Sequence, residues 1–328
     1  MGHTLDRKVS PRSRITEDID HIVPETGQSF DVHHLSPEFG GTAFKAVLFI
    51  PDEPSTTETT VYSYGVGANA VQYRQEAEAI AALGMPVALH NDPRKDPKLN
   101  LLKLATSSRS RSALKKHVQN PVLRSSQATE RVMDAVDNLG QLSGNFKLKA
   151  HSKGGLPASM LAAHDERIKT VTFDGPAGFV LRNALFNHAS SLGAIGKNVK
   201  EFMSYMNEYG PEDSMSESLG HVKSNPILLG REILFLVAKR PNVTPLLEEV
   251  QERGNTSVAV ISHEHDAFFK DTDMQLAVEQ LAARGLVHHH LRSLNTKHTN
   301  PMDNPIGSAH LYQEAVTQAE TNSFLRAS

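Results

Sequence analysis

The sequence contains no cysteine. This absence excludes disulfides, thiolate catalysis and zinc sites built from cysteine. An excess of one charge is also missing, because 34 Lys and Arg residues nearly balance 37 Asp and Glu residues and leave a formal net charge of −3. Such a chain has no strong field of one sign, so we expect neither nucleic acid nor an anionic membrane as a partner.

Long apolar runs are absent as well. No segment approaches the roughly 18 apolar residues that a membrane span requires. The polar start of the chain, M-G-H-T-L-D-R-K-V-S-P-R-S-R, lacks the apolar centre of a secretory signal. We therefore expect a soluble, cytoplasmic protein without a membrane span, whose residues 1–25 form a loose arm.

What is present is a regular alternation of strand-like and helix-like segments. Strands are expected at Ser29–Leu35, Phe44–Ile50, Thr60–Tyr64, Met85–Asn91, Phe146–Ala150, Ile168–Phe173, Ser257–Ser262 and Val287–Leu294. Helices are expected from Asn69 to Leu83, Gln127 to Leu142, Gly155 to His164, Thr244 to Gly254, Asp273 to Ala283 and Gly307 to Thr321. This order predicts an α/β protein with a mostly parallel central sheet of about eight strands and helices on both faces.

Two stretches interrupt the alternation. The basic segment Asp92–Ser126 is expected to be a solvated excursion, with a site for an acidic ligand as the alternative. Residues 179–243 contain helical runs but no convincing strand. We therefore divide the chain into an arm (1–25), a first core part (26–178), a helical insertion (179–243) and a second core part (244–328).

One short motif carries the chemistry. In F-K-L-K-A-H-S-K-G-G-L-P, a strand ends at Ser152 and a helix follows two glycines. A serine hydroxyl is a weak nucleophile until a base accepts its proton and backbone donors face the developing oxyanion. A strand–serine–helix turn places the hydroxyl at a sheet edge and at a helix N-terminus, where free N–H groups point outward.

A-H-S-K-G, from Ala150 to Gly154, resembles the nucleophile elbow G-x-S-x-G of the α/β-hydrolase fold, with alanine at the first position. The resemblance implies a nucleophilic Ser152, followed along the chain by an acid and then a histidine. It also implies that the insertion over 179–243 is a helical cap above the site. The resemblance extends from about Ser29 to the last helix.

The resemblance directs the search for the acid to the end of a later strand and for the histidine to the loop after the last one. Asp266 in S-H-E-H-D is the preferred acid, Asp174 is the alternative, and Glu264 is a third choice. His298 in L-N-T-K-H-T is the preferred histidine, and His310 is the runner-up.

The same resemblance implies an oxyanion hole made by two backbone N–H groups. One comes from Lys153, directly after the nucleophile, and the other from Val66 in Y-G-V-G. Tyr64 stands where the family often has histidine. The following G-V-G-A-N-A lacks the last glycine of a dinucleotide loop, because Ala70 occupies that position.

Seventeen histidines raise the question of a metal. His263 and His265 alternate along one strand, and His288–His290 are consecutive, but no further ligands stand at a recognisable spacing. We expect no metal and no cofactor. The resulting hypothesis is a serine hydrolase acting on a small-molecule ester or acyl substrate. The alternatives are an acyltransferase, a thioesterase or amidase with the same triad, and a non-enzymatic binding protein on this fold. A homodimer is left open.

Overall fold

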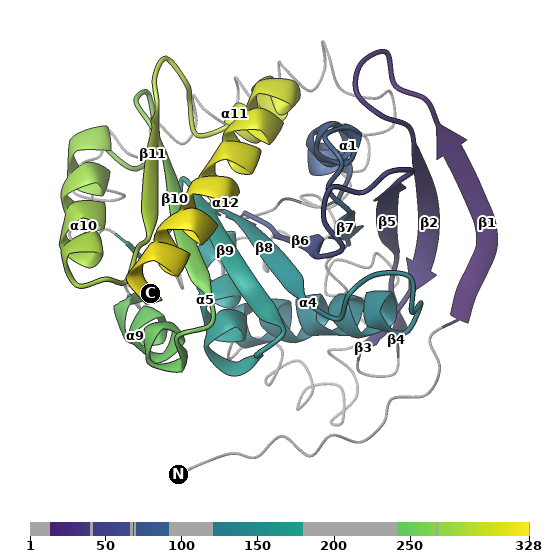
Figure 1. Cartoon of the computed structure of the whole chain (residues 1–328), viewed down its shortest axis with the longest axis horizontal. Helices are drawn as coiled ribbons and strands as arrows, with labels where there is room; N and C mark the ends of the chain where they lie inside the picture. Colours follow the sequence, from purple (N-terminus) through teal and green to yellow (C-terminus); the bar gives the residue numbers. More distant parts are fainter. Residues whose placement is uncertain are drawn as a thin grey trace, which may run out of the picture.

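The computed structural model describes residues 14–39, 42–65, 68, 70–91, 121–179, 242–266 and 268–327. Within them, nine strands form one sheet in the order β1-β2-β5-β7-β6-β8-β9-β10-β11 (Figure 1). The strands of this sheet are β1 (Arg14–Ile22), β2 (Phe30–Ser36), β5 (Ala46–Pro51), β6 (Thr59–Ser63), β7 (Val87–His90), β8 (Phe146–His151), β9 (Ile168–Asp174), β10 (Ser257–His263) and β11 (His289–Ser293). A two-stranded sheet joins β3 (Glu38–Phe39) to β4 (Thr42–Ala43).

The sheet is mostly parallel, as the sequence predicts. The strands from β7 to β11 along the sheet order are parallel, whereas β1, β2 and β5 pair antiparallel at one edge. Parallel strands buried on both faces read as continuous apolar runs, and β10 is buried at every position. The carboxyl ends of the parallel strands meet at one edge, where sites in such folds are found.

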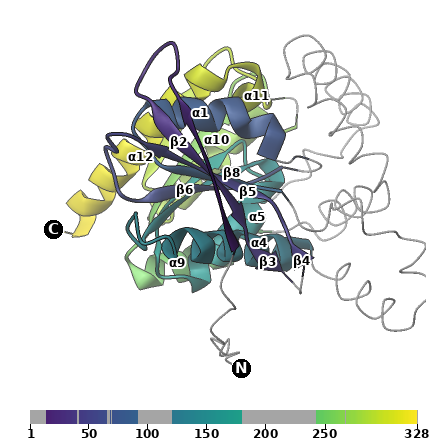
Figure 2. The same ribbon diagram turned by 90° about the vertical axis from the view of Figure 1, so that its right-hand side faces the viewer.

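Helices cover both faces of the sheet (Figure 2). They are α1 (Arg74–Ala82), α4 (Pro121–Asp137), α5 (Gly155–His164), α9 (Thr244–Arg253), α10 (Asp271–Ala283), α11 (Asn300–Asp303) and α12 (Pro305–Ala327), and two 3₁₀ turns, η1 (Ala70–Tyr73) and η3 (Ser152–Gly154), precede α1 and α5. Alternate strand residues belong to different cores. Val61 lies in the core that includes residues of α4, α5, α9 and α10, whereas Tyr62 lies in the core that includes residues of α1 and α12. Among the described helices, none is both long enough and apolar enough to span a bilayer.

Several expected boundaries are corrected. Residues 1–25 are not a loose arm throughout, because Arg14–Ile22 forms β1 and pairs with β2. An edge strand can be held by backbone hydrogen bonds with few buried side chains, and Ile19 is 53% exposed. α4 begins at Pro121 instead of Gln127, and the helix after β6 begins with the 3₁₀ turn η1. Asn69 and residues 92–120 lie outside the described residues.

The insertion predicted over 179–243 lies almost wholly outside the described residues, but its two ends are in view. The N–H of Val243 donates to the carbonyl of Gly178 at 3.2 Å, and Phe179 packs on Phe173 with ring centroids 4.9 Å apart. The chain therefore leaves the core and returns to it at one point after β9. The core continues from there into α9.

Four buried ionisable side chains, from α1, β8, β9 and β10, form a series of ion pairs in the core. Lys149 of β8 is fully buried and pairs with Glu76 of α1 and, at 3.4 Å, with Asp174 of β9. Asp174 also accepts from Nε2 of His263 at 2.6 Å. Buried charges are tolerated when they are paired and hydrogen-bonded, and these four groups form two such pairs.

His263 carries a proton on both ring nitrogens. The Thr296 hydroxyl gives its proton to the Ser293 carbonyl, so its oxygen must accept from Nδ1 of His263, at 2.9 Å. Burial by itself lowers the pKa of His263, but the Asp174 carboxylate outweighs it and raises this pKa above its ordinary value. Burial raises the pKa of Asp174, whereas His263 and Lys149 lower it. The net result is a pKa below the ordinary value.

This pair predicts a pH-dependent stability. Because the folded-state pKa of His263 is raised, its contribution is complete below the unfolded value, about 6.5, and is lost as pH rises through the folded value. We expect His263→Gln to lower the unfolding free energy near pH 6 by on the order of 3–5 kcal/mol. Between about pH 6 and 9, the stability of the variant should also fall less than that of the wild type. Urea unfolding of both proteins across this range measures the difference.

His310→Gln, at an exposed position on α12, is the control and should follow the wild type at every pH. Equal pH slopes for the wild type and His263→Gln would show that His263 is not the titrating group.

Candidate functional site

Ser152 lies at a sharp turn between β8 and α5. Its φ is 54°, in the left-handed region that residues other than glycine rarely adopt. Such strain costs on the order of 1–3 kcal/mol and persists only where the surroundings hold it. The turn lifts Ser152 to the carboxyl edge of the sheet, as the elbow motif predicts.

Close packing explains the glycine that follows. A Cβ on Gly154 would lie 2.0 Å from the carbonyl oxygen of Ser63 in β6, so only glycine fits there. The Ser63 hydroxyl donates to the Gly154 carbonyl at 2.9 Å and ties the two segments together. Ala150, which replaces the first glycine of the motif, is fully buried in the core that contains α4 and α5, so its methyl group is accommodated.

The loop after β6 begins beside the serine. A Cβ on Gly65 would lie 3.4 Å from Cβ of Ser152, which places the start of the predicted oxyanion loop next to the elbow. Val66 itself lies outside the described residues, and Lys153 is buried. Tyr64 ties this loop to β7, since its hydroxyl accepts from the His90 N–H at 2.8 Å. Tyr64, which stands where the family often has histidine, therefore holds the start of this loop to β7.

Asp266 and His298 form a hydrogen-bonded pair. Nδ1 of His298 lies 2.8 Å from Oδ2 of Asp266. Oδ1 of Asp266 accepts the N–H groups of Phe268 and Phe269 at 2.7 and 2.9 Å. Burial alone raises the pKa of Asp266, but His298 and these N–H donors hold it below its ordinary value. The carboxylate is therefore ionised at neutral pH and keeps the Nδ1 proton on His298.

This pair lies on the same edge of the sheet as Ser152. A Cβ on Gly175, directly after β9, would be 2.9 Å from Nδ1 of His298, and Gly175 has a φ of 51°. The next turn is joined to the elbow, because the Ala177 N–H donates to the Ser152 carbonyl at 2.9 Å. In this structure the Ser152 hydroxyl makes no hydrogen bond to His298 within the described residues. Such bonds are often long without substrate and shorten in the complex.

The alternative acids and the alternative histidine lie elsewhere. Asp174 pairs with His263 and Lys149 rather than with His298. Glu264 accepts from the Asn295 N–H at 2.9 Å and from Arg292 at 3.3 Å. His310 is exposed on α12. Of the three candidate acids, only Asp266 contacts His298.

The histidines that suggested metal ligands are not gathered together. His263 is buried in its pair with Asp174, whereas His265 is exposed. In the part of the chain that the structure describes, one set of side chains could converge on a cation: His21, Asp31 and Asp52, with ligand atoms within 4.8 Å of one another. These groups lie largely in solvent, and His21 already bonds to Asp31 at 2.9 Å.

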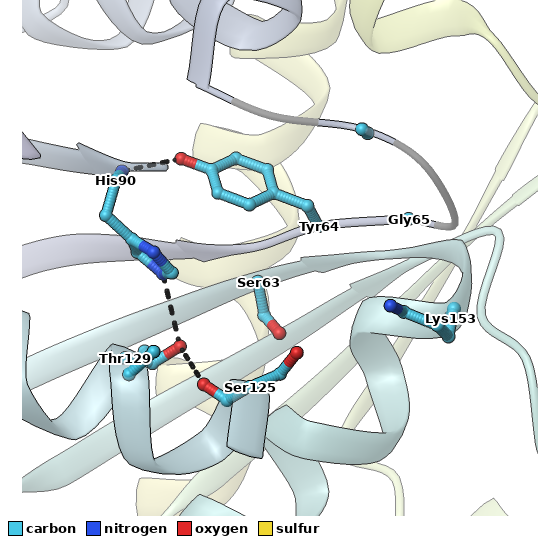
Figure 3. Close-up of a pocket in the computed structure, with 9 residues that line it drawn as sticks. Ser63, Tyr64, Gly65, His90, Ser125, Thr129 and Lys153 are labelled. Carbon is cyan, nitrogen blue, oxygen red and sulfur yellow. Dashed lines mark hydrogen bonds between the residues drawn. The ribbon is translucent and has the colours of Figure 1, made fainter. Parts of the chain in front are cut away.

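A small pocket lies beside the elbow (Figure 3). It is lined by Ser63, Tyr64, Gly65, Ala68, His90, Ser125, Ala128, Thr129 and Lys153. Nε2 of His90 lies 3.3 Å from the Thr129 hydroxyl, which donates to the Ser125 carbonyl at 3.0 Å. Sequence reasoning did not identify this pocket. His90 does stand at the carboxyl end of an expected strand, where polar side chains mark a site.

Comparison with solved structures, but not with protein families or curated sequences, finds proteins similar to this chain. No protein-family model matches the sequence, and no curated protein matches it. Among solved structures, a membrane phospholipase A described as a bacterial virulence factor is similar with a TM-score of 0.57 and 13% identity, over 88% of this chain and 86% of that one. A hydrolase from Oleispira antarctica is similar with a TM-score of 0.54 and 14% identity, over 83% and 94% of the two chains.

A thermophilic esterase from Thermogutta terrifontis is similar with a TM-score of 0.53 and 11% identity, over 88% of this chain and 98% of that one. Identities this low show a shared fold and nothing finer. These structural similarities, together with the nine-stranded mixed sheet and its helices on both faces, show that this chain has the α/β-hydrolase fold.

Proposed function

We propose that the protein is a serine hydrolase that cleaves carboxylic esters through an acyl-enzyme on Ser152. The observation that carries the proposal is the strained φ of Ser152 at the strand–helix turn, on the sheet edge that also holds the Asp266–His298 pair. A backbone held in a rarely populated conformation beside an oriented imidazole is typical of a nucleophile and its base.

In the first step, Oγ of Ser152 attacks the ester carbonyl carbon while Nε2 of His298 takes its proton. The C=O π electrons move to the oxygen, which the N–H groups of Val66 and Lys153 bind in this proposal. When the carbonyl re-forms, the bond to the alkoxy oxygen breaks and His298 returns the proton to the leaving alcohol. Asp266 stabilises the imidazolium that exists between the two transfers and holds Nδ1 protonated.

In the second step, water replaces the alcohol. His298 removes a proton from water as the water oxygen attacks the acyl carbon, and then gives that proton to Oγ of Ser152 as the acid leaves. The hydrogen bond to Asp266 supports both transfers, because the carboxylate orients the imidazole while two backbone N–H groups hold its other oxygen. The enzyme ends the cycle unchanged.

The choice of an ester rests on chemistry and on similarity. A neutral serine–histidine pair with an oxyanion site suits acyl transfer. Solved structures that share the fold are described as a phospholipase, a hydrolase and an esterase, which supports an ester as substrate. Because fold alone does not fix the reaction, the experiments below decide it.

Ser152→Ala should abolish labelling by a fluorophosphonate probe and lower the turnover of a panel of short- and long-chain p-nitrophenyl esters by at least about 10⁴-fold. The reason is that only Ser152 would supply the attacking oxygen. Ser159→Ala is the matched control, because Ser159 is a buried serine on α5 whose hydroxyl bonds to the Gly155 carbonyl. An unlabelled wild type, or a panel on which Ser152→Ala changes nothing, would refute the enzyme proposal.

Asp266→Asn should lower kcat by about 10⁴-fold while the protein stays folded by circular dichroism. The amide neither stabilises the imidazolium nor fixes the Nδ1 proton. Glu264→Gln, two residues away, should keep turnover within a few-fold of the wild type, because Glu264 bonds to Asn295 and Arg292. If folded Asp174→Asn lost activity while Asp266→Asn kept it, the acid would be Asp174.

A further inference from the structure

Three buried groups, starting with Tyr73 of the 3₁₀ turn η1, form a hydrogen-bonded series that ends at the backbone of His298. The Tyr73 hydroxyl lies 2.6 Å from Nδ1 of His151, and Nε2 of His151 lies 2.8 Å from the carbonyl oxygen of His298. Both side chains are buried, with Tyr73 fully inaccessible and His151 3% exposed. Nothing in the proposed mechanism uses either of them.

The partners define the protonation of His151. A carbonyl oxygen can only accept, so Nε2 of His151 carries a proton and donates it to His298. Burial, with a further contribution from His298, lowers the pKa of His151 to about 3, so the ring is neutral. Nδ1 then has a lone pair, and the Tyr73 hydroxyl donates to it. Each ring nitrogen of His151 therefore has one defined role, while the Tyr73 hydroxyl also bonds to the backbone of Gly65.

The position of Tyr73 and His151 matters because three segments of the site lie beside them. His151 precedes Ser152, and its ring lies 4.7 Å from the ring of His298, centroid to centroid. A Cβ on Gly65 would lie 3.4 Å from Nδ1 of His151 and 3.6 Å from the Tyr73 hydroxyl. The elbow, the start of the oxyanion loop and the loop of His298 thus meet at one pair of side chains.

We propose that Tyr73 and His151 are positioning residues, a strut that fixes the main chain of His298 so that its imidazole faces Ser152. The proposal rests on the function proposed above. Neither residue touches the reacting atoms. The strut acts because His298 stands on a loop between β11 and α11, and the His151 bond joins this loop to the rigid end of β8. A displacement of about 1 Å at a reacting group can cost roughly 10²-fold in rate.

A neutral strut also suits the charge that develops beside it. His298 becomes positively charged when it accepts the serine proton, and a second cation at 4.7 Å between ring centroids would oppose this step. Lysine or arginine at position 151 could also donate to the His298 carbonyl, but each would bring a charge. A neutral histidine provides the donor without the charge.

Tyr73→Phe is the most direct test, because it keeps the ring and removes only the hydroxyl. We expect kcat to fall about 10- to 100-fold with KM nearly unchanged, and the rate of fluorophosphonate labelling of Ser152 to fall in parallel. Tyr312→Phe is the matched control, since it removes another buried hydroxyl, bonded to Thr60 at 2.9 Å, on α12. It should lower stability by a similar amount and leave kcat unchanged.

Substitution of His151 gives a second, independent measure. His151→Gln offers both an amide donor for the His298 carbonyl and an acceptor for Tyr73, whereas His151→Phe offers neither. Activity should decrease in the order wild type, His151→Gln, His151→Phe. In ¹⁵N NMR spectra of histidine-labelled wild type, His151 should be the neutral tautomer protonated at Nε2, and Tyr73→Phe should shift the signals of both His151 and His298.

The outcomes separate the two proposals. If the wild type is labelled at Ser152 and folded Tyr73→Phe keeps full kcat and labelling rate, the strut is refuted while the hydrolase remains. An Nδ1-protonated or charged His151 would also refute the strut. If the wild type is not labelled, both proposals fail together. A loss of kcat in Tyr73→Phe and not in Tyr312→Phe supports the strut.

Discussion

The close contact between the elbow and β6 is the constraint on which the rest of the site depends. The backbone of Gly154 lies so near Ser63 that no side chain fits between them. This contact and the bond from Ser63 to the Gly154 carbonyl fix the turn, and the turn holds Ser152 at a φ of 54°. The local strain is sustained by packing across two neighbouring parallel strands, since a single strand–helix connection would relax. Ser152 is therefore held by the sheet rather than by its own segment.

The loop of His298 depends on two buried histidines in opposite protonation states. His263 is cationic, because Asp174 and Thr296 both accept from it, and it holds the side chain of Thr296. His151 is neutral, because a carbonyl accepts at one nitrogen and burial disfavours its charge, and it holds the main chain of His298. The same residue type thus serves two purposes, and the hydrogen-bond partners decide between them: a carboxylate accepts from His263, whereas a carbonyl and a hydroxyl bond to His151. The cation lies next to Asp174 and the neutral ring lies next to the group that becomes charged in the proposed reaction.

The mostly parallel sheet and the elbow could be predicted from the sequence, because the strands, the helices and the turn each have a local signal. β10 contains the apolar run from Val258 to Ile261, and Ser152 stands between a strand and two glycines. β1 could not be predicted, because it is an edge strand whose stability comes from pairing with β2, and Ile19 remains exposed. The contacts of Tyr73 and His151 are also invisible in the sequence, since they join residues 78 positions apart. The sequence places His90 at the end of an expected strand, but it does not show that the ring lies beside the Thr129 hydroxyl.

The choice between Asp266 and Asp174 shows what a sequence leaves undecided. Both follow or end a parallel strand on the same edge, so spacing permits either. Asp174 is fully buried and has two cation partners, Lys149 and His263. A turn toward His298 would leave the buried His263 without its carboxylate and Lys149 with Glu76 alone. Asp266 is hydrogen-bonded to the His298 imidazole, and two backbone N–H donors hold its other oxygen. Asp266 is thus the acid of the proposed mechanism because it already bonds to the imidazole, whereas Asp174 is engaged by the buried Lys149 and His263.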